Sequence, residues 1–80
     1  MTILYLSEEG STLEKKGDRL KIRKVNDTLK ELPLEKVDGI ILMGNTHVTT
    51  PLMSELLERE IPLTWLSNTG KFYGRLEPTT

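Results

Sequence analysis

The sequence contains no cysteine among its 80 residues. This absence excludes disulfide scaffolds, thiolate zinc sites, iron–sulfur clusters and a cysteine nucleophile, and it agrees with a reducing, cytoplasmic location. Long hydrophobic runs are also lacking: the longest clear one, residues 39–43, is far below the roughly 20 residues that span a bilayer. The first six residues have no basic segment of the kind that opens a signal peptide, so we expect a strand there and no membrane partner.

An excess of one charge sign is missing as well, because 11 Lys and Arg face 12 Asp and Glu, for a net charge of −1. That balance argues against non-specific nucleic-acid binding. The charges are unevenly placed, however. Residues 15–24 carry six basic side chains against Asp18 alone, a local excess of +5 that leaves −6 for the rest of the chain.

Short apolar and β-branched runs, each bounded by turn-forming residues, predict strands at residues 2–6, 11–16, 19–25, 28–32, 39–43, 63–66 and 71–76. Six or seven strands, most joined by tight turns, and one short helix predict a mainly β (α+β) fold, either a small β-sandwich or a partly open barrel. A chain this short buries only roughly 60–65% of its unfolded surface, so we expect one thin core. The run at 39–43 is apolar on both faces, which predicts a central strand covered on both sides.

A glycine-aspartate pair, Gly17 and Asp18, separates two of these runs. Because glycine adopts positive φ without steric cost, a tight hairpin is expected at this pair. In the second arm of the hairpin, apolar and basic residues alternate. Strand periodicity therefore directs Arg19, Lys21 and Arg23 together to one solvent-facing strip.

The single helix is predicted to begin at Thr50 and Pro51, since threonine caps helices and proline is tolerated at the first helical position. Four apolar residues follow at helical spacing on one face, and two glutamates lie on the other face, in solvent. The apolar residues are Leu52, Met53, Leu56 and Leu57, and the glutamates are Glu55 and Glu58.

Candidate catalytic groups are sparse. His47 is the only histidine, and no second ligand lies on an obvious shared face, so a turn histidine with a structural hydrogen bond is expected rather than a ligand or base. No phosphate-binding glycine loop is present, and no serine has a base beside it in sequence. Tyr5 and Tyr73 are expected to form the wall of a sheet, and Trp65 the core. We predict neither catalytic nor metal-binding residues.

The basic hairpin has two interpretations. A two-stranded ribbon with cations on its outer face can follow a phosphate backbone, and each neutralised phosphate releases counterions. Lysine and arginine also keep exposed hairpins soluble and protect sheet edges. The residues alone leave both interpretations open, and they define a soluble, mainly β module without a recognisable active site.

A set of motifs runs in order along nearly the whole chain. They lie at residues 4–6, 10, 13, 15–20, 32–37, 40–45, 49–51, 56–57, 61–66 and 70–76. The most specific combination is Gly44-Asn45 after an apolar strand, then the helix, the Ile61-Pro62 strand and a hairpin with Gly70 and Gly74. In these motifs the sequence resembles the N-terminal domain of the CRISPR-associated integrase, the endonuclease subunit of the spacer-acquisition (adaptation) complex.

The resemblance implies that residues 1–80 are the N-terminal β-domain of a larger metal-dependent nuclease, which inserts spacers into the CRISPR array in antiviral defence. In that family, a helical C-terminal domain, absent from this chain, carries the glutamate, histidine and aspartate that bind Mg²⁺ or Mn²⁺ for phosphoryl transfer. No cofactor is therefore expected in this chain, and by itself it should be catalytically silent.

The resemblance also implies partners. They are a second copy of the domain in a homodimer, DNA in the form of the protospacer duplex and the CRISPR repeat, and the second, small subunit of the adaptation complex. The basic side chains then become candidate contacts to the DNA backbone. The candidates are Lys15, Lys16, Arg19, Lys21, Arg23, Lys24 and Arg75.

Two other hypotheses stay open. A protein-interaction or dimerisation module without DNA contact would use its basic segment only for solubility. A small independent enzyme would need a pocket that joins His47 to a carboxylate.

Overall fold

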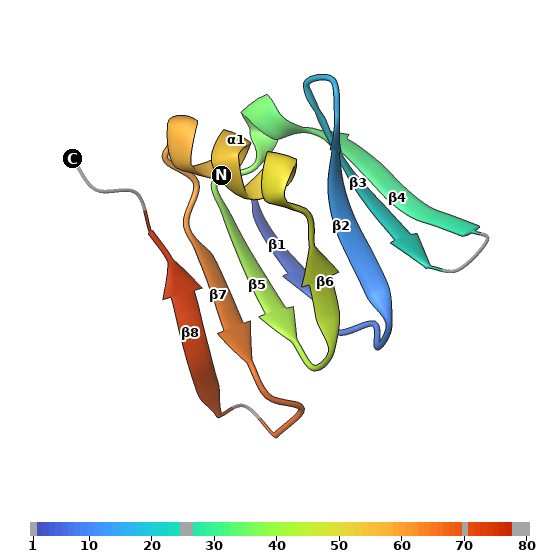
Figure 1. Ribbon diagram of the computed structural model, residues 1–80, viewed down its shortest axis with the longest axis vertical. Helices are drawn as coiled ribbons and strands as arrows, with labels where there is room; N and C mark the ends of the chain where they lie inside the picture. The colour runs from blue at the N-terminus through green and yellow to red at the C-terminus, as the bar shows by residue number, and fades with distance from the viewer. Residues whose placement is uncertain (1, 25–26, 70, 78–80) are drawn as a thin grey trace.

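The structure is a computed structural model that describes residues 2–24, 27–69 and 71–77. Within these residues, eight strands form two four-stranded sheets and are joined by one α-helix and a 3-10 turn (Figure 1). The elements are β1 Ile3–Leu6, β2 Ser11–Lys16, β3 Arg19–Lys24, β4 Asp27–Pro33, the 3-10 turn Leu34–Lys36, β5 Gly39–Met43, β6 Thr46–Val48, α1 Thr50–Glu58, β7 Leu63–Leu66 and β8 Phe72–Leu76.

The first sheet, sheet A, has the strand order β1-β5-β7-β8, and the second, sheet B, has the order β4-β3-β2-β6. Strands β1, β5 and β7 run parallel, and β8 returns antiparallel to β7. In sheet B, β2, β3 and β4 form an antiparallel meander, and β6 joins it parallel to β2. The chain crosses from sheet A to sheet B twice, and a 2.9 Å hydrogen bond from Gly10 N–H to the Asn45 carbonyl ties the two crossings together.

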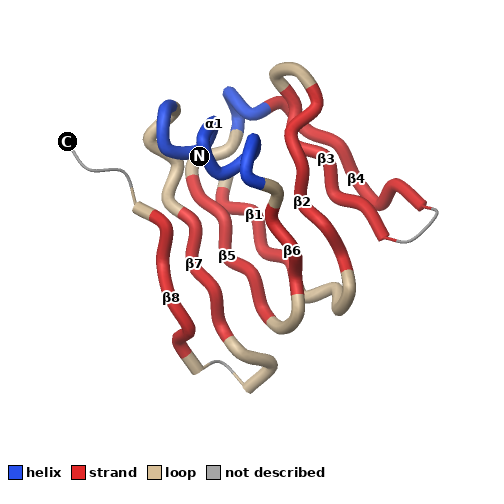
Figure 2. The backbone as a smooth tube through the Cα atoms, viewed as in Figure 1, coloured by secondary structure: helices blue, strands red, loops and turns tan. Residues whose placement is uncertain are grey.

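The core lies between the sheets, where each strand directs alternate side chains inward. The helical segments lie near one end of the strands (Figure 2), and α1 closes the core there with Leu52 and Leu56. The buried apolar residues are Leu4, Leu6, Leu13, Leu20, Ile22, Leu34, Val37, Ile40, Leu42, Leu52, Leu56, Ile61 and Leu63. This architecture confirms the mainly β fold that the sequence predicts. Among the described residues, no helix has the length and apolar character needed to traverse a membrane.

The boundaries of the seven predicted strands agree with the observed ones to within one residue at each end. Strand β3 ends at Lys24, and Val25, which the prediction included, lies outside the described residues. Strand β6 is not predicted by the sequence, because it is only three residues long and two of them are polar. His47 therefore lies in an edge strand of sheet B rather than in a turn.

Three predictions about the burial of apolar residues are wrong. Strand β5 is central in sheet A, but on its outer face only Gly39 is buried, and Ile41 and Met43 are half-buried. Trp65 is also half-buried, packed against the core instead of inside it. On α1, whose N-cap is Thr49 rather than Thr50, the apolar face is narrower than predicted, since Leu57 is 39% exposed.

Candidate nucleic-acid interface

The outer face of sheet B gathers the charged side chains of three neighbouring strands. Strand alternation turns Leu20 and Ile22 inward, as predicted, and the intervening cations outward. The register places Glu14 and Glu31 on either side of Lys21, and Lys16 opposite Arg19. We call this surface the sheet B face; its described members are Thr12, Glu14, Lys16, Arg19, Lys21, Arg23, Glu31 and His47.

Carboxylates on the sheet B face are paired with its cations. Glu14 lies 3.2 Å from Arg23 Nε and 4.0 Å from Lys21 Nζ, and Glu31 lies 3.3 Å from Arg19 Nε. Four cations against two carboxylates leave the face with a net charge of +2, well below the +5 counted along residues 15–24. The face excludes Lys15, Lys24 and Asp18 of that segment, which leaves +4, and strand pairing adds Glu14 and Glu31, which brings the charge to +2.

The other candidate DNA contacts lie away from the sheet B face. Lys15 leaves β2 on the same side as the buried Leu13, and its Nζ lies 2.9 Å from Glu55 of α1. Lys24, near the end of β3, pairs with Glu8 at 3.3 Å. Arg75 belongs to sheet A and pairs with Glu77 at 3.7 Å. The structure thus brings Lys16, Arg19, Lys21 and Arg23 together and leaves the other three apart.

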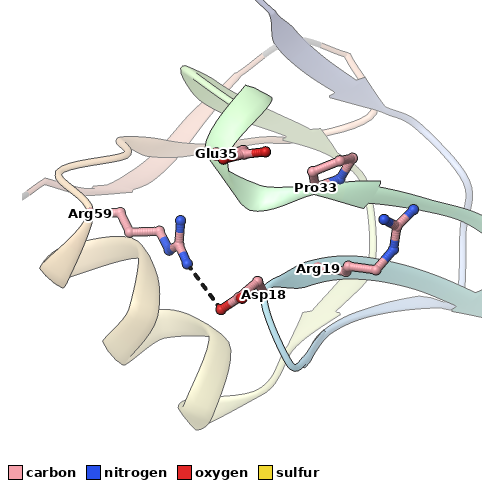
Figure 3. Close-up of a pocket in the computed structure, with 5 residues that line it drawn as sticks. All are labelled: Asp18, Arg19, Pro33, Glu35 and Arg59. Carbon is pink, nitrogen blue, oxygen red and sulfur yellow. Dashed lines mark hydrogen bonds and ion pairs between the residues drawn. The ribbon is translucent and has the colours of Figure 1, made fainter.

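An ion-pair network holds α1 against the β2–β3 hairpin. Glu55 binds Lys15 and, at 2.7 Å, Arg59, and Arg59 extends to Asp18 at the hairpin turn (Figure 3). Hydrogen bonds from Lys15 and then Arg59 lower the pKa of Glu55, and the hydrogen bond to Glu55 raises the pKa of Lys15 and of Arg59. Only 16% of the Glu55 side chain is exposed, so the predicted solvent position of this glutamate is wrong. Lys15 therefore has a structural role, because its ammonium group pairs with Glu55 of α1.

His47 lies at the edge of the sheet B face, opposite Thr12 in the register. It lines an open, polar hollow of about 380 Å³ with Gly10, Ser11, Thr12, Asn45 and Thr46. Among the described residues, no three histidine, cysteine, aspartate or glutamate side chains come together in a way that could hold a metal ion. The resemblance assigns Mg²⁺ or Mn²⁺ to a domain outside residues 1–80, and we derive no metal-dependent step from the described residues.

The outer face of sheet A is apolar, which the sequence does not predict. Tyr5 and Tyr73 lie in strands of this sheet, as the sequence predicts, and are 67% and 68% exposed, while Phe72 is 59% exposed. The register sets Tyr5 beside Ile41 and Met43 beside Leu66, all on the side away from the core. We call this surface the sheet A face; its members are Ile3, Tyr5, Ile41, Met43, Thr64, Leu66, Phe72 and Arg75. The missing polar alternation of residues 39–43 is the sequence signal for this surface.

Two thin sheets with a cationic outer face and an apolar outer face are typical of a small domain that contacts other macromolecules. A family model described as CRISPR associated protein Cas1 matches residues 4–80, so the chain belongs to the Cas1 family, as its sequence motifs predict.

Curated relatives carry the same assignment. The CRISPR-associated exonuclease Cas4/endonuclease Cas1 fusion of Geobacter sulfurreducens is 37% identical over 76 residues, which are 95% of this chain and 14% of that protein. A CRISPR-associated endonuclease Cas1 of Thermus thermophilus is 32% identical over 79 residues, 96% of this chain and 24% of that protein. The chain therefore spans less than a quarter of the length of either relative.

Solved structures share the fold. A partial Cas6-RT-Cas1–Cas2 complex superposes with a TM-score of 0.85 at 21% identity, over 99% of this chain and 24% of that chain. A TtCas1–DNA complex superposes with a TM-score of 0.77 at 19% identity, over 92% of this chain and 28% of that chain. The two-sheet arrangement is thus that of Cas1 proteins.

Proposed function

We propose that this chain is the dimerisation and DNA-binding domain of a metal-dependent Cas1 endonuclease/integrase that inserts spacers into a CRISPR array. The observation that carries the proposal is the division of the surface into the cationic sheet B face and the apolar sheet A face. Among the structures with this fold, one is a complex with DNA and another includes Cas2, so both kinds of partner fit a domain of this shape.

The DNA contact is assigned to the sheet B face. Its cations, Lys16, Arg19, Lys21 and Arg23, occupy adjacent antiparallel strands and project from the same side of the sheet, so they can contact neighbouring phosphates together. Lys15, Lys24 and Arg75 remain candidates at the margins of such a contact. The partners proposed are the protospacer duplex and the CRISPR repeat.

The DNA assignment is tested by fluorescence anisotropy with a labelled duplex of about 30 base pairs at about 50 and 200 mM salt. If roughly three phosphates are neutralised, affinity should fall about 40-fold between the two salt concentrations. Replacing the four cations of the sheet B face with glutamine should abolish the salt-sensitive part of the duplex affinity. An unchanged affinity in that variant would contradict the assignment.

Self-association is assigned to the sheet A face. A two-fold dimer presents the same patch from both copies, and burial of tyrosine, phenylalanine and isoleucine stabilises such contacts. The chain should therefore sediment as a dimer at high micromolar concentration. Tyr5→Glu should shift it to monomer, whereas Lys21→Gln, on the opposite face, should leave the dimer intact. A monomeric wild-type chain would rule out this assignment.

The alternative function is an assembly module without DNA contact. It is favoured by one observation: six of the seven candidate cations already pair with carboxylates. Exposed ion pairs of this kind contribute only about 0–1 kcal/mol each, so phosphate can displace them, which is why we place this function second. A dimer that binds no duplex at either salt concentration would establish it.

Catalysis is assigned to residues outside this chain. In the whole protein, Mg²⁺ or Mn²⁺ would supply the charge that stabilises an attacked phosphate. The 80 residues should neither cleave nor join DNA in either metal. Activity at the rate of a complete enzyme would place the catalytic site here after all. A cytoplasmic location and a small Cas2-type subunit as partner belong to the same proposal.

A further inference from the structure

We infer that Glu14 is a built-in competitor for DNA phosphate on the sheet B face, and that it limits how many of the face's cations engage DNA. The inference rests on the proposed DNA contact, and it ranks the cations of the face by how readily each can bind phosphate. Arg23 and Lys21 are held back by Glu14, whereas Lys16 is available from the start.

The contacts of Glu14 with Arg23 resemble those of a phosphate. Glu14 Oε1 lies 3.2 Å from Arg23 Nε, and Oε2 lies 3.3 Å from Arg23 Nη2. A guanidinium presents the same fork of N–H groups to the two oxygens of a phosphate. A phosphate therefore reaches this fork of Arg23 only by replacing the carboxylate.

The position of Glu14 lets it hold a second cation. It lies on β2, between β3 and β6, directly opposite Lys21, and Oε1 is 4.0 Å from Lys21 Nζ. The Glu14 side chain is 26% exposed, so water screens these attractions less than it would at a fully exposed site. One carboxylate thus restrains two of the four cations on the face.

Lys16 differs from these two cations. It is exposed at the hairpin end of β2, opposite Arg19, and none of the carboxylates in the described part of the chain forms an ion pair with it. A phosphate can pair with Lys16 without breaking a contact within the protein. We therefore assign the first DNA contact to the hairpin end of the face.

The test compares duplex binding by the wild-type chain and Glu14→Gln across a salt series. Releasing two cations from exposed ion pairs should tighten binding roughly three- to tenfold. It should also steepen the slope of log K against log salt by about 1 to 2, because the slope counts neutralised phosphates.

Two controls separate competition from a simple change in net charge. Glu58→Gln removes the same charge from the exposed side of α1 and should leave the salt slope unchanged. In a Lys21→Gln/Arg23→Gln background, Glu14→Gln should no longer steepen the slope, since no held cation remains to be released. Circular dichroism of each variant checks that it is folded.

The outcomes distinguish this inference from the proposed function. If the wild-type chain binds duplex and Glu14→Gln matches Glu58→Gln in affinity and slope, the inference is wrong and the DNA contact stands. If only Glu14→Gln binds, the inference holds and the unmodified domain is not a DNA-binding unit. If neither binds, both are overturned.

Discussion

At the scale of single residues, the two crossings between the sheets depend on glycine. Gly44 has φ of 84° and donates its N–H to the Leu66 carbonyl at 2.9 Å, while the next residue, Asn45, donates its N–H to the Glu9 carboxylate at 3.2 Å. A Cβ at position 44 would overlap the side chains of Glu9 and Asn68. Gly10, at φ of 75°, has open space around the same position.

This difference predicts unequal costs for two alanine substitutions. Gly10→Ala should lower the free energy of unfolding by about 1–2 kcal/mol, the cost of a positive φ for a residue with a Cβ. Gly44→Ala adds the loss of the Glu9 hydrogen bond, so it should cost about 2–3 kcal/mol. Urea unfolding of both variants measures the difference between their free energies of unfolding. Equal midpoints would mean that crowding at Gly44 does not destabilise the fold.

The residues of the interface could be predicted only in part from the sequence. The outward direction of Arg19, Lys21 and Arg23 follows from strand periodicity, which is a local property. Their carboxylate partners depend on strand register, which sets Glu14 across the hairpin from Lys21 and brings Glu31 of β4 to Arg19. A count of charge along the chain therefore overestimates the basic character of the surface.

At the scale of elements, α1 is joined to the hairpin of sheet B by packing and by charge. Leu56 is fully buried, while its neighbour Leu57 is 39% exposed. Glu55 carries the ion pairs to Lys15 and Arg59 on the side of the helix that faces the hairpin. Each contribution can be removed separately.

The packing contribution predicts a large difference between adjacent leucines. Leu56→Ala should lower the free energy of unfolding by about 2–5 kcal/mol, because it leaves a cavity in a thin core. Leu57→Ala removes a side chain with much of its surface in water and should cost less than about 1 kcal/mol. Chemical denaturation of the two variants checks this, and a reversed order would place the wrong helix face in the core.

The charge contribution predicts a dependence of stability on pH. The pKa of Glu55 is lowered in the folded chain, so its stabilising effect is present above its ordinary value of 4.5 and is lost as pH falls through the lower folded value. The pKa of Lys15 is raised, so its effect is present below 10.5 and is lost as pH rises through the higher folded value.

Glu55→Gln should therefore reduce stability at neutral pH and flatten the loss of stability below pH 4.5. Urea midpoints measured across this range test it. Glu60→Gln, an exposed position just after the helix, should retain the wild-type acid dependence. If the urea midpoints of Glu55→Gln fell with acid as steeply as those of the wild type, protonation of Glu55 would make no contribution to the acid dependence of stability.

Elements with strong local signals were predictable, whereas elements that depend on long-range pairing were not. The β2–β3 hairpin follows from Gly17, which has φ of 62° in the turn. Strand β6 forms because Thr46–Val48 pairs in parallel with β2, a contact that no local pattern encodes. The parallel pairing of β1, β5 and β7 is likewise set by tertiary contacts rather than by tight turns.

At the scale of the whole molecule, the two sheets share one core and present two outer faces of different chemistry. The sheet A face exposes Tyr5 and Phe72, and the sheet B face carries a net charge of +2. This division explains why the sequence of β5 is apolar on both faces, since its inner side belongs to the core and its outer side to the sheet A face. The central claim is that DNA and the second copy use separate faces.

Amide chemical-shift mapping by NMR, with a short duplex added to the 80-residue chain, tests that claim most directly. We expect the duplex to shift the amides of β2 and β3, most strongly near Lys16 and Arg19, and to leave those of β1 and β5 in place. Dilution of the DNA-free sample should instead move the amides of β1, β5 and β8. Shifts on β1 and β5 upon DNA addition, with β2 and β3 unchanged, would contradict the account.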